Sequence, residues 1–111
     1  MRMWMVDPSR MCMRHIAGEH GELHKHLRSF EKRHSISGRV KPGSVQIEPL
    51  EMKRRHDLLA KFLRNHSSPY EMPDLSYLPK EEREARVDVG LSERELAKRC
   101  VECRRLLKRN G

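Results

Sequence analysis

Long apolar runs and aromatic residues are scarce in this sequence, and each scarcity narrows what the chain can be. No apolar stretch approaches the roughly 18 residues that a membrane-spanning helix needs, and the N-terminus has no hydrophobic signal region. Hydrophobic residues make up 36% of the 111 residues and aromatic residues only 5%, which allows one modest core. We therefore expect a cytosolic protein with its true N-terminus present and a single domain over residues 1–111.

Cysteine is also sparse, with Cys12, Cys100 and Cys103 the three in the chain. An odd number of cysteines without a secretory signal favours reduced thiols. Cys100 and Cys103 form a C-x-x-C motif, but it falls inside a helical pattern, whereas redox motifs favour a helix N-terminus. A zinc site would need two more ligands, which Cys12 and a histidine could supply. We expect packed core thiols instead, and no metal or other cofactor.

Acidic residues are outnumbered, 16 against 24 lysines and arginines, which gives a formal net charge of +8. A small folded domain with this balance usually binds a polyanion. The alternative is that surface charge merely keeps the protein soluble, and nucleic acid is the partner that we favour. The basic run from Lys53 to His56 falls near the start of a predicted helix, where positive charge opposes the helix dipole. Such a placement suggests a partner, with a solvated face as the simpler alternative.

Start signals and apolar spacing predict three helices. These begin at Asp7-Pro8, Glu48-Pro49 and the Ser92–Glu95 capping box, and they end near His34, His66 and Lys108. Long loops join them over Ser35 to Pro49 and Ser67 to Val89, and short extended segments are possible at Met1–Val6 and Val45–Ile47. The expected fold class is all-α, a single domain of three main helices joined by long loops.

Apolar periodicity also predicts which side chains are buried. The inward positions of the second helix are predicted to be Leu50, Leu58, Leu59, Phe62 and Leu63. The packing anchors of the second loop are predicted to be Tyr70, Leu75, Tyr77 and Leu78. Gly18 and Gly21, three apart in the first helix, suggest a close approach to its backbone, with a local kink as the alternative.

The first helix concentrates titratable groups on one side. By helical spacing, one stripe holds His15, Glu19, Glu22 and His26, while the adjacent stripe looks like a core face. Two carboxylates and two imidazoles on one stripe indicate either a working face or a solvated charged face. These side chains are capable metal ligands, but the other predicted helices offer too few partners for a di-metal bundle, so a metal enzyme is disfavoured.

An amine nucleophile needs no such partners, because a neutral amine forms Schiff bases with sugar carbons by itself. The reference pKa of an α-amino group, near 7.7–8.0, leaves a sizeable fraction neutral at physiological pH, whereas a lysine starts near 10.4 and must be desolvated. An apolar N-terminus that is tied down beside a glutamate-bearing helix would suit this chemistry.

The order of these features resembles the pyrimidine-dimer DNA glycosylase family, of the phage endonuclease V type. The shared pattern is an N-terminal amine, H-x-x-x-E-x-x-E-L over His15 to Leu23, a basic middle helix and a late Tyr77-Leu78-Pro79. The resemblance covers most of the chain loosely and implies an all-α fold built on three helices. It also implies an enzyme that removes damaged pyrimidines from double-stranded DNA with its α-amine and then cuts the strand by β-elimination.

Carried over by position, the resemblance implies catalytic roles for Met1, His15, Glu19 and Glu22. The Met1 amine would attack the sugar C1′, and Glu22 would steer protons and stabilise the imine. Arg2 follows Met1, and initiator methionines are generally trimmed only before small side chains, so Met1 is expected to stay. With Met1 kept, the spacing from the amine to Glu22 matches that of the family.

Basic side chains are predicted to contact the phosphates of damaged double-stranded DNA: Arg2, Lys25, Lys53, Arg54 and Arg55. Two departures from the family pattern bear on which lesion is removed, since Gly21 stands at a second basic position and the aromatic C-terminal tail has no counterpart. We expect a monomer in the cytoplasm, associated with the nucleoid through DNA. The alternatives are a lyase or glycosylase for another lesion or for abasic sites only, a non-catalytic DNA-binding helical protein, and a structural metal protein.

Overall fold

Helices dominate the part of the chain that the computed structural model describes, residues 2–64 and 69–110. Helix accounts for 62% of the structure and strand for 4%, in one small domain, so the expected helical character is confirmed. The elements in order are η1 (Pro8–Arg10), α1 (Met13–Glu31), η2 (Ser37–Arg39), β1 (Val40–Lys41), β2 (Ser44–Val45), η3 (Pro49–Glu51), α2 (Met52–Leu63), α3 (Lys80–Arg83), α4 (Val89–Arg99) and α5 (Val101–Asn110). Among these helices, none is both long enough and apolar enough to cross a membrane.

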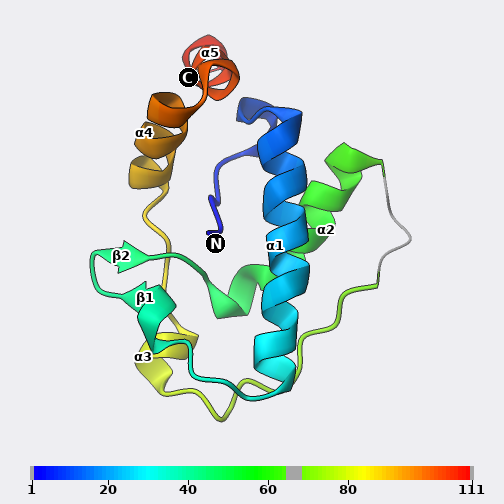
Figure 1. Cartoon of the computed structure of the whole chain (residues 1–111), viewed down its shortest axis with the longest axis vertical. Helices are drawn as coiled ribbons and strands as arrows, with labels where there is room; N and C mark the ends of the chain where they lie inside the picture. The colour runs from blue at the N-terminus through cyan, green and yellow to red at the C-terminus, as the bar shows by residue number, and fades with distance from the viewer. Residues whose placement is uncertain (1, 65–68, 111) are drawn as a thin grey trace.

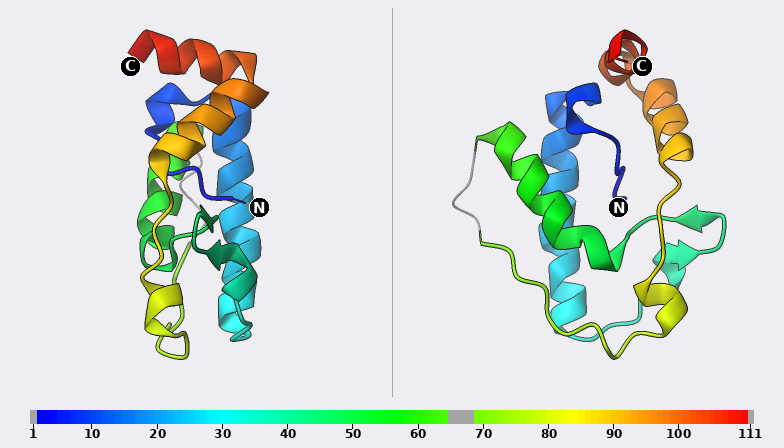
Figure 2. Two further views of the ribbon diagram at one scale, coloured as in Figure 1. Left: turned by 90° about the vertical axis from the view of Figure 1, so that its left-hand side faces the viewer. Right: turned by 180° about the vertical axis from the view of Figure 1, so that it is seen from behind.

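The central element of the fold is α1, in a flattened molecule that measures 41 × 35 × 17 Å along its principal axes. α2 packs against α1, while α4 and α5 pack on each other near the start of α1 (Figures 1 and 2). A short antiparallel hairpin pairs Val40 with Val45, and its turn places Gly43 at a φ of 80°, which glycine adopts without strain. The hairpin falls within the predicted loop between the first two helices.

The N-terminal segment, residues 2–6, forms neither helix nor strand, turns at Met5 (φ 58°) and runs through the interior of the molecule, as expected for an apolar terminus. It begins beside the middle of α1 and passes between α1 and α4 (Figures 1 and 2). Met3 and Val6 are fully buried, and the Met3 N–H donates a 2.7 Å hydrogen bond to the Gln46 carbonyl. The start of the described chain is therefore fixed against both α1 and the segment that precedes η3.

The predicted first helix is interrupted near its start. Asp7 does act as a cap, accepting a 3.0 Å hydrogen bond from the Ser9 N–H, but Pro8–Arg10 forms only a 3₁₀ turn. The backbone is extended at Met11 and Cys12, and α1 begins at Met13, with Cys12 as its N-cap. The prediction of one continuous helix from Pro8 is wrong because the chain changes direction at Cys12.

The predicted third helix is interrupted in the same way. Its N-cap is Asp88, which accepts a 3.1 Å hydrogen bond from the Leu91 N–H, so the predicted capping box at Ser92 is wrong and Ser92 is buried within α4. The backbone is extended at Cys100, where α4 ends and α5 follows. The C-x-x-C motif therefore stands at the start of α5 and not inside a helix, which corrects the sequence-based placement.

α2 presents a different face to the core from the one that its leucines predict. Leu50, Leu58 and Phe62 are exposed, whereas Leu59 is buried and Leu63 partly so. Two polar side chains, Arg55 and His56, are buried in their place. The prediction for the three exposed residues is wrong because α1 offers polar partners, described below, that outweigh the apolar pattern of α2.

The segment that follows α2 wraps around the body through the predicted anchors. Tyr70 is buried and donates a 2.8 Å hydrogen bond to the Leu23 carbonyl, and the Tyr77 hydroxyl donates one of 3.1 Å to the His34 carbonyl. Leu78 is also buried, and Leu75 packs against the core, so this prediction is confirmed. The close approach predicted at Gly18 and Gly21 is not made by the described protein, since a Cβ at either position would meet nothing within 4 Å.

Candidate active site

The residues predicted to act together lie along α1 and the N-terminal segment. Met1, the predicted nucleophile, lies outside the described residues. Arg2, the first described residue, is half-buried, with its guanidinium 4.9 Å from the centre of the Trp4 ring and Nη2 donating a 3.2 Å hydrogen bond to Ser92 Oγ. Its Nε is buried without a hydrogen-bond partner among the described residues. Arg2 is thus held in place, and its predicted phosphate contact stays a prediction.

Glu22 lies at the middle of α1, the part of the helix beside which the N-terminal segment begins. Its side chain is 35% exposed, and the Lys25 ammonium lies 3.9 Å from Oε1. Because the Lys25 side chain is itself 78% exposed, this contact is a loose surface pair of little energetic weight. The Glu22 carboxylate is therefore accessible to a ligand, as a proton-transfer group must be.

Glu19 is not available for such a role. It is 2% exposed, and Arg55 holds both of its carboxylate oxygens, with Nε donating to Oε2 at 2.6 Å and Nη2 to Oε1 at 2.8 Å. Arg55, 4% exposed, also donates from Nη1 to the Val6 carbonyl at 2.8 Å. Two predictions are therefore corrected: Glu19 does not face a substrate, and Arg55 does not reach a phosphate, because each satisfies the other inside the core.

His15 is placed away from Glu22. Seven residues separate them along α1, which is roughly 10 Å of helix rise. The His15 Nδ1 lies 3.1 Å from Cys12 Sγ and 3.6 Å from Cys103 Sγ. Burial lowers the pKa of His15, and the charges of Arg14 and Arg99 lower it further. The structure thus groups His15 with the cysteines, and its predicted action together with Glu22 stays a prediction.

His26 is a site residue that the sequence placed on the stripe without assigning it a role. It is buried one helical turn beyond Glu22, and Arg39 Nη1 lies 3.1 Å from its Nε2. A guanidinium only donates, so Nε2 accepts and the neutral ring carries its proton on Nδ1. That nitrogen is buried without a hydrogen-bond partner in the part of the chain that the structure describes. Burial, followed by the charge of Arg39, lowers the pKa of His26 to about 4.

The depressed pKa of His26 predicts a loss of stability in acid. The unfolded histidine titrates near pH 6.5, so between pH 6.5 and 4 the unfolded chain binds more protons than the folded protein. The stability contributed by the neutral, buried His26 is therefore full above pH 6.5 and is lost as the pH falls toward 4. The expected loss is on the order of 2–3 kcal/mol. In His26→Gln, whose amide oxygen can still accept from Arg39, urea unfolding at pH 7 and 4.5 should show a shallower pH dependence. The exposed His34→Gln is the control. If the free energy of unfolding changed equally with pH in the wild type and in both variants, the low pKa would not belong to His26.

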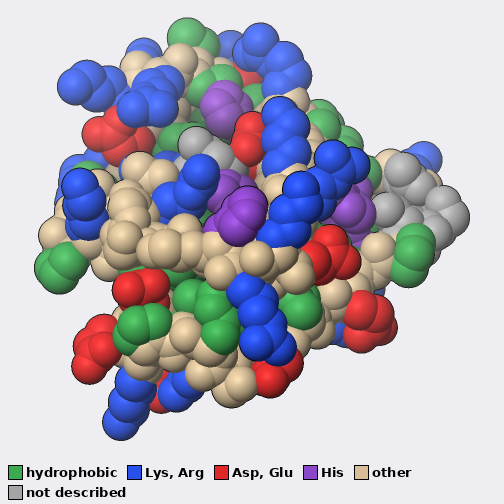
Figure 3. Space-filling view, turned by 60° about the horizontal axis from the view of Figure 1, so that its bottom comes forward, with side chains coloured by type: hydrophobic (Ala, Val, Ile, Leu, Met, Phe, Trp, Pro, Cys, Tyr) green, Lys and Arg blue, Asp and Glu red, His purple; other side chains and the backbone are tan. Residues whose placement is uncertain are grey.

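The remaining predicted phosphate contacts differ in how accessible they are. Arg54 is 84% exposed and lies only 3.6 Å from Glu51, its single-turn neighbour on the helix. Lys53 donates to the Tyr70 carbonyl at 3.0 Å and to Asp57 at 3.3 Å, so it is partly engaged. Figure 3 shows lysine and arginine side chains spread over one face of the molecule with histidines between them. Lys25, Lys53 and Arg54 therefore remain candidates for binding a polyanion.

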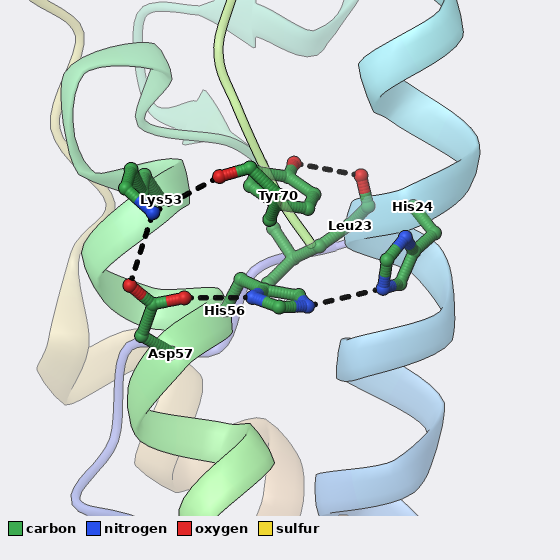
Figure 4. Close-up of polar contacts among 6 residues, drawn as sticks. All are labelled: Leu23, His24, Lys53, His56, Asp57 and Tyr70. Atoms are coloured by element: carbon green, nitrogen blue, oxygen red, sulfur yellow. Dashed lines mark hydrogen bonds and ion pairs between the residues drawn. The ribbon is translucent and has the colours of Figure 1, made fainter. Parts of the chain in front are cut away.

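A second group of imidazoles fills the interface between α1 and α2. We call His20, His24 and His56 the three-histidine cluster (Figure 4 shows two of its members, with Tyr70). Asp57 accepts from His56 Nδ1 at 3.0 Å, which leaves His56 Nε2 to accept from His24 Nε2 at 3.0 Å. Tyr70 stacks on the His56 ring at 4.4 Å. Burial lowers the pKa of His20 and of His24, with His56 adding to both shifts.

The three ring nitrogens of this cluster lie within 4.8 Å of one another, so three imidazoles could face one ion. The hydrogen bond from His24 to His56, however, already uses the lone pair that a metal would need. His56, bonded to both Asp57 and His24, links the two helices, while His20 Nε2 is buried without a hydrogen-bond partner among the described residues. The sequence does not reveal this cluster, because His56 belongs to the basic run that begins at Lys53 and its imidazole neighbours come from a different helix.

No family model, curated protein or solved structure matches this chain. A functional conclusion therefore depends on the site itself: a fixed N-terminal segment, an accessible carboxylate at the middle of α1, a neutral buried histidine one turn away, and a basic surface.

Proposed function

We propose that this protein is a DNA repair glycosylase with an associated AP-lyase activity, acting on damaged pyrimidines in double-stranded DNA, pyrimidine dimers foremost. The observation that carries the proposal is the N-terminal segment, in which Met3, Trp4 and Val6 are buried and which begins beside the middle of α1, where Glu22 is accessible. Ordering a chain segment costs conformational entropy, and a role for the amine that precedes this segment would explain why Met3 and Val6 are held in the interior.

The proposed reaction uses the α-amine of residue 1 as the nucleophile, without a cofactor. The nitrogen lone pair bonds to C1′ as the glycosidic bond breaks, and the damaged base leaves with its electron pair and takes up a proton. Ring opening gives an imine, which acidifies C2′. Glu22 accepts the C2′ proton, and the C3′–O bond breaks with release of the 3′ phosphate. A carboxylate positioned for proton transfer contributes about 10²–10⁴-fold to such steps.

DNA binding in this proposal rests on the net charge of +8 and on exposed cations near the site. Lys25 lies one turn from Glu22, and Arg54 and Lys53 extend the basic surface to α2. Gly18 and Gly21 leave the α1 backbone bare on its exposed side, which allows a DNA strand to approach closely. The damaged nucleotide, or its partner base, would be extruded from the duplex to reach C1′.

Reductive trapping tests the proposal directly. Borohydride reduces an imine to a stable amine, so incubation with duplexes carrying a thymine dimer, an abasic site or neither should yield a covalent adduct with the first two only. Peptide mapping should place the adduct on the Met1 amine. An adduct on Lys25 or another lysine would reject the α-amine mechanism, and binding without any adduct would favour a non-catalytic DNA-binding protein.

A further inference from the structure

Two short motifs from opposite ends of the chain meet at one point in the fold. Cys12 and His15 form C-x-x-H at the start of α1, and Cys100 and Cys103 form C-x-x-C at the start of α5. α5 packs against η1, the turn that leads into α1 (Figure 1). This packing brings three sulfurs and one imidazole nitrogen within 4.8 Å of one another. We call these four residues the Cys3His cluster.

We propose that the Cys3His cluster binds one structural zinc ion. Zinc bonds of about 2.3 Å to sulfur and about 2.0–2.1 Å to nitrogen place two ligating sulfurs about 3.8 Å apart in a tetrahedron, and a sulfur and a nitrogen about 3.5 Å apart. Cys12 Sγ lies 3.8 Å from Cys100 Sγ, and Cys103 Sγ lies 3.6 Å from His15 Nδ1. The 3.1 Å from Cys12 Sγ to His15 Nδ1 is the short edge, which a small rotation of the imidazole would lengthen.

Backbone amides in the cluster donate to the sulfurs. The Cys12 N–H points to Cys103 Sγ at 3.3 Å, and the Cys103 N–H points to Cys100 Sγ at 3.5 Å. Hydrogen bonds to a charged acceptor are roughly twice as strong as those to a neutral one, so these amides suit thiolates better than thiols. Donors of this kind commonly support and orient the ligands of a metal ion.

The surroundings also offset the charge of such a site. Three thiolates, a neutral imidazole and Zn²⁺ together carry a net charge of −1. Cys12 is the N-cap residue of α1, and Cys100 immediately precedes α5 and accepts from the Cys103 N–H of that helix, so the cluster lies at two helix N-termini, where the helix dipole is positive. The charges of Arg14 and Arg99 also reach His15. Positive charge and helix N-termini are the conditions that favour deprotonated cysteine.

Neither a disulfide nor simple packing accounts for these observations. A disulfide needs sulfurs about 2.05 Å apart, against the 3.8 Å found between Cys12 and Cys100. Packing of apolar thiols would not require the backbone to leave the helical conformation at both cysteines, where φ and ψ are −76° and 159° at Cys12 and −134° and 120° at Cys100. Each break places the first cysteine of its motif at a helix start, where its sulfur meets the other three donors.

The geometry indicates a structural ion and not a catalytic one. Four protein ligands complete a tetrahedron and leave no position for water or substrate, and the three cysteines are buried. The ion would join residues 88 apart in the chain and so hold α4 and α5 against the start of α1. Because Ser92 of α4 accepts from Arg2, the same link would also help to fix the N-terminal segment.

Metal analysis and X-ray absorption of the wild-type protein test the proposal. Protein purified under reducing conditions without chelator should contain one zinc per chain. The zinc edge should show three sulfur neighbours at about 2.3 Å and one nitrogen at about 2.0–2.1 Å. A shell of nitrogen alone would assign the ion to the three-histidine cluster and overturn the proposal. Protein that neither contains zinc nor takes it up on refolding with zinc would overturn it too.

Variants locate the ion and its role. Cys103→Ser should lose the zinc, whereas His24→Gln, a matched change in the three-histidine cluster, should keep one equivalent. A folded Cys103→Ser protein with full zinc content would contradict the assignment; if the variant does not fold, the wild-type spectrum decides. Removing zinc from wild-type protein with a chelator should lower the melting temperature, and restoring zinc should reverse the change. An unchanged melting temperature would refute a structural role.

Discussion

Arg55→Met is expected to destabilise the protein by about 3–5 kcal/mol, which is the usual effect of removing one partner from a buried ion pair. The substitution leaves the Glu19 carboxylate buried without the two hydrogen bonds that Arg55 now donates, and it also removes the donor to the Val6 carbonyl. A domain of this size is typically stable by only 5–15 kcal/mol, so the loss is a large fraction of the total. Urea unfolding at pH 7 measures it.

Two further variants separate the ion pair from general effects of the substitution. Arg54→Met, at the neighbouring and exposed position, should change the stability by less than about 0.5 kcal/mol. The double variant Glu19→Met/Arg55→Met should be more stable than Arg55→Met alone, because no buried charge is left unpaired. If Arg55→Met is as stable as wild type and instead weakens DNA binding with a smaller salt dependence, then Arg55 leaves the core to bind phosphate, and the structural assignment is wrong.

Glu22→Gln is expected to reduce strand cleavage at least ~100-fold while leaving DNA binding and folding intact, because the amide keeps the shape of the side chain but cannot accept the C2′ proton. The side chain is 35% exposed and makes only a 3.9 Å contact with Lys25, so little stability depends on it. Single-turnover cleavage of a lesion-bearing duplex measures the rate, and an equilibrium titration of the same duplex measures binding.

Glu31→Gln provides the matched control for this prediction, since Glu31 is an exposed carboxylate at the far end of the same helix. It should cleave at the wild-type rate. Full cleavage by Glu22→Gln would remove Glu22 from the mechanism. Equal losses in both variants would indicate that net charge near the DNA is responsible, and not a positioned carboxylate.

Local sequence signals predicted the helical class and some of the turns that caps and prolines set, although the capping box predicted at Ser92 was wrong. Asp7 caps a turn as predicted, Pro49 begins the next one, and Tyr70 and Leu78 anchor the long segment that follows α2. These features depend on a few neighbouring residues or on the burial of large apolar side chains, which a sequence displays directly. The N-terminal segment was likewise predicted to be buried because it is apolar.

The wrong predictions concern residues whose burial depends on a partner that is distant in the sequence. α2 carries leucines on the face that the sequence assigns to the core, yet it buries Arg55 and His56, because α1 supplies Glu19 and His24 as hydrogen-bond partners. A buried charge is acceptable only with such a partner, and periodicity on one helix does not reveal the other. The helix breaks at Cys12 and Cys100 were missed for the same reason, because each cysteine meets its partners from the other end of the chain.

The sequence by itself determined that the chain is helical, strongly basic and apolar at its N-terminus, and it identified the stripe on α1 that includes Glu22. Only the tertiary structure decided how that stripe is divided: Glu22 is accessible, Glu19 is locked to Arg55, and His15 joins the cysteines. The physical reason is that helical spacing places residues on a common face, whereas charge, access and ligation depend on what packs against each turn of that face. Those neighbours come from α2 and α5, far away in the chain.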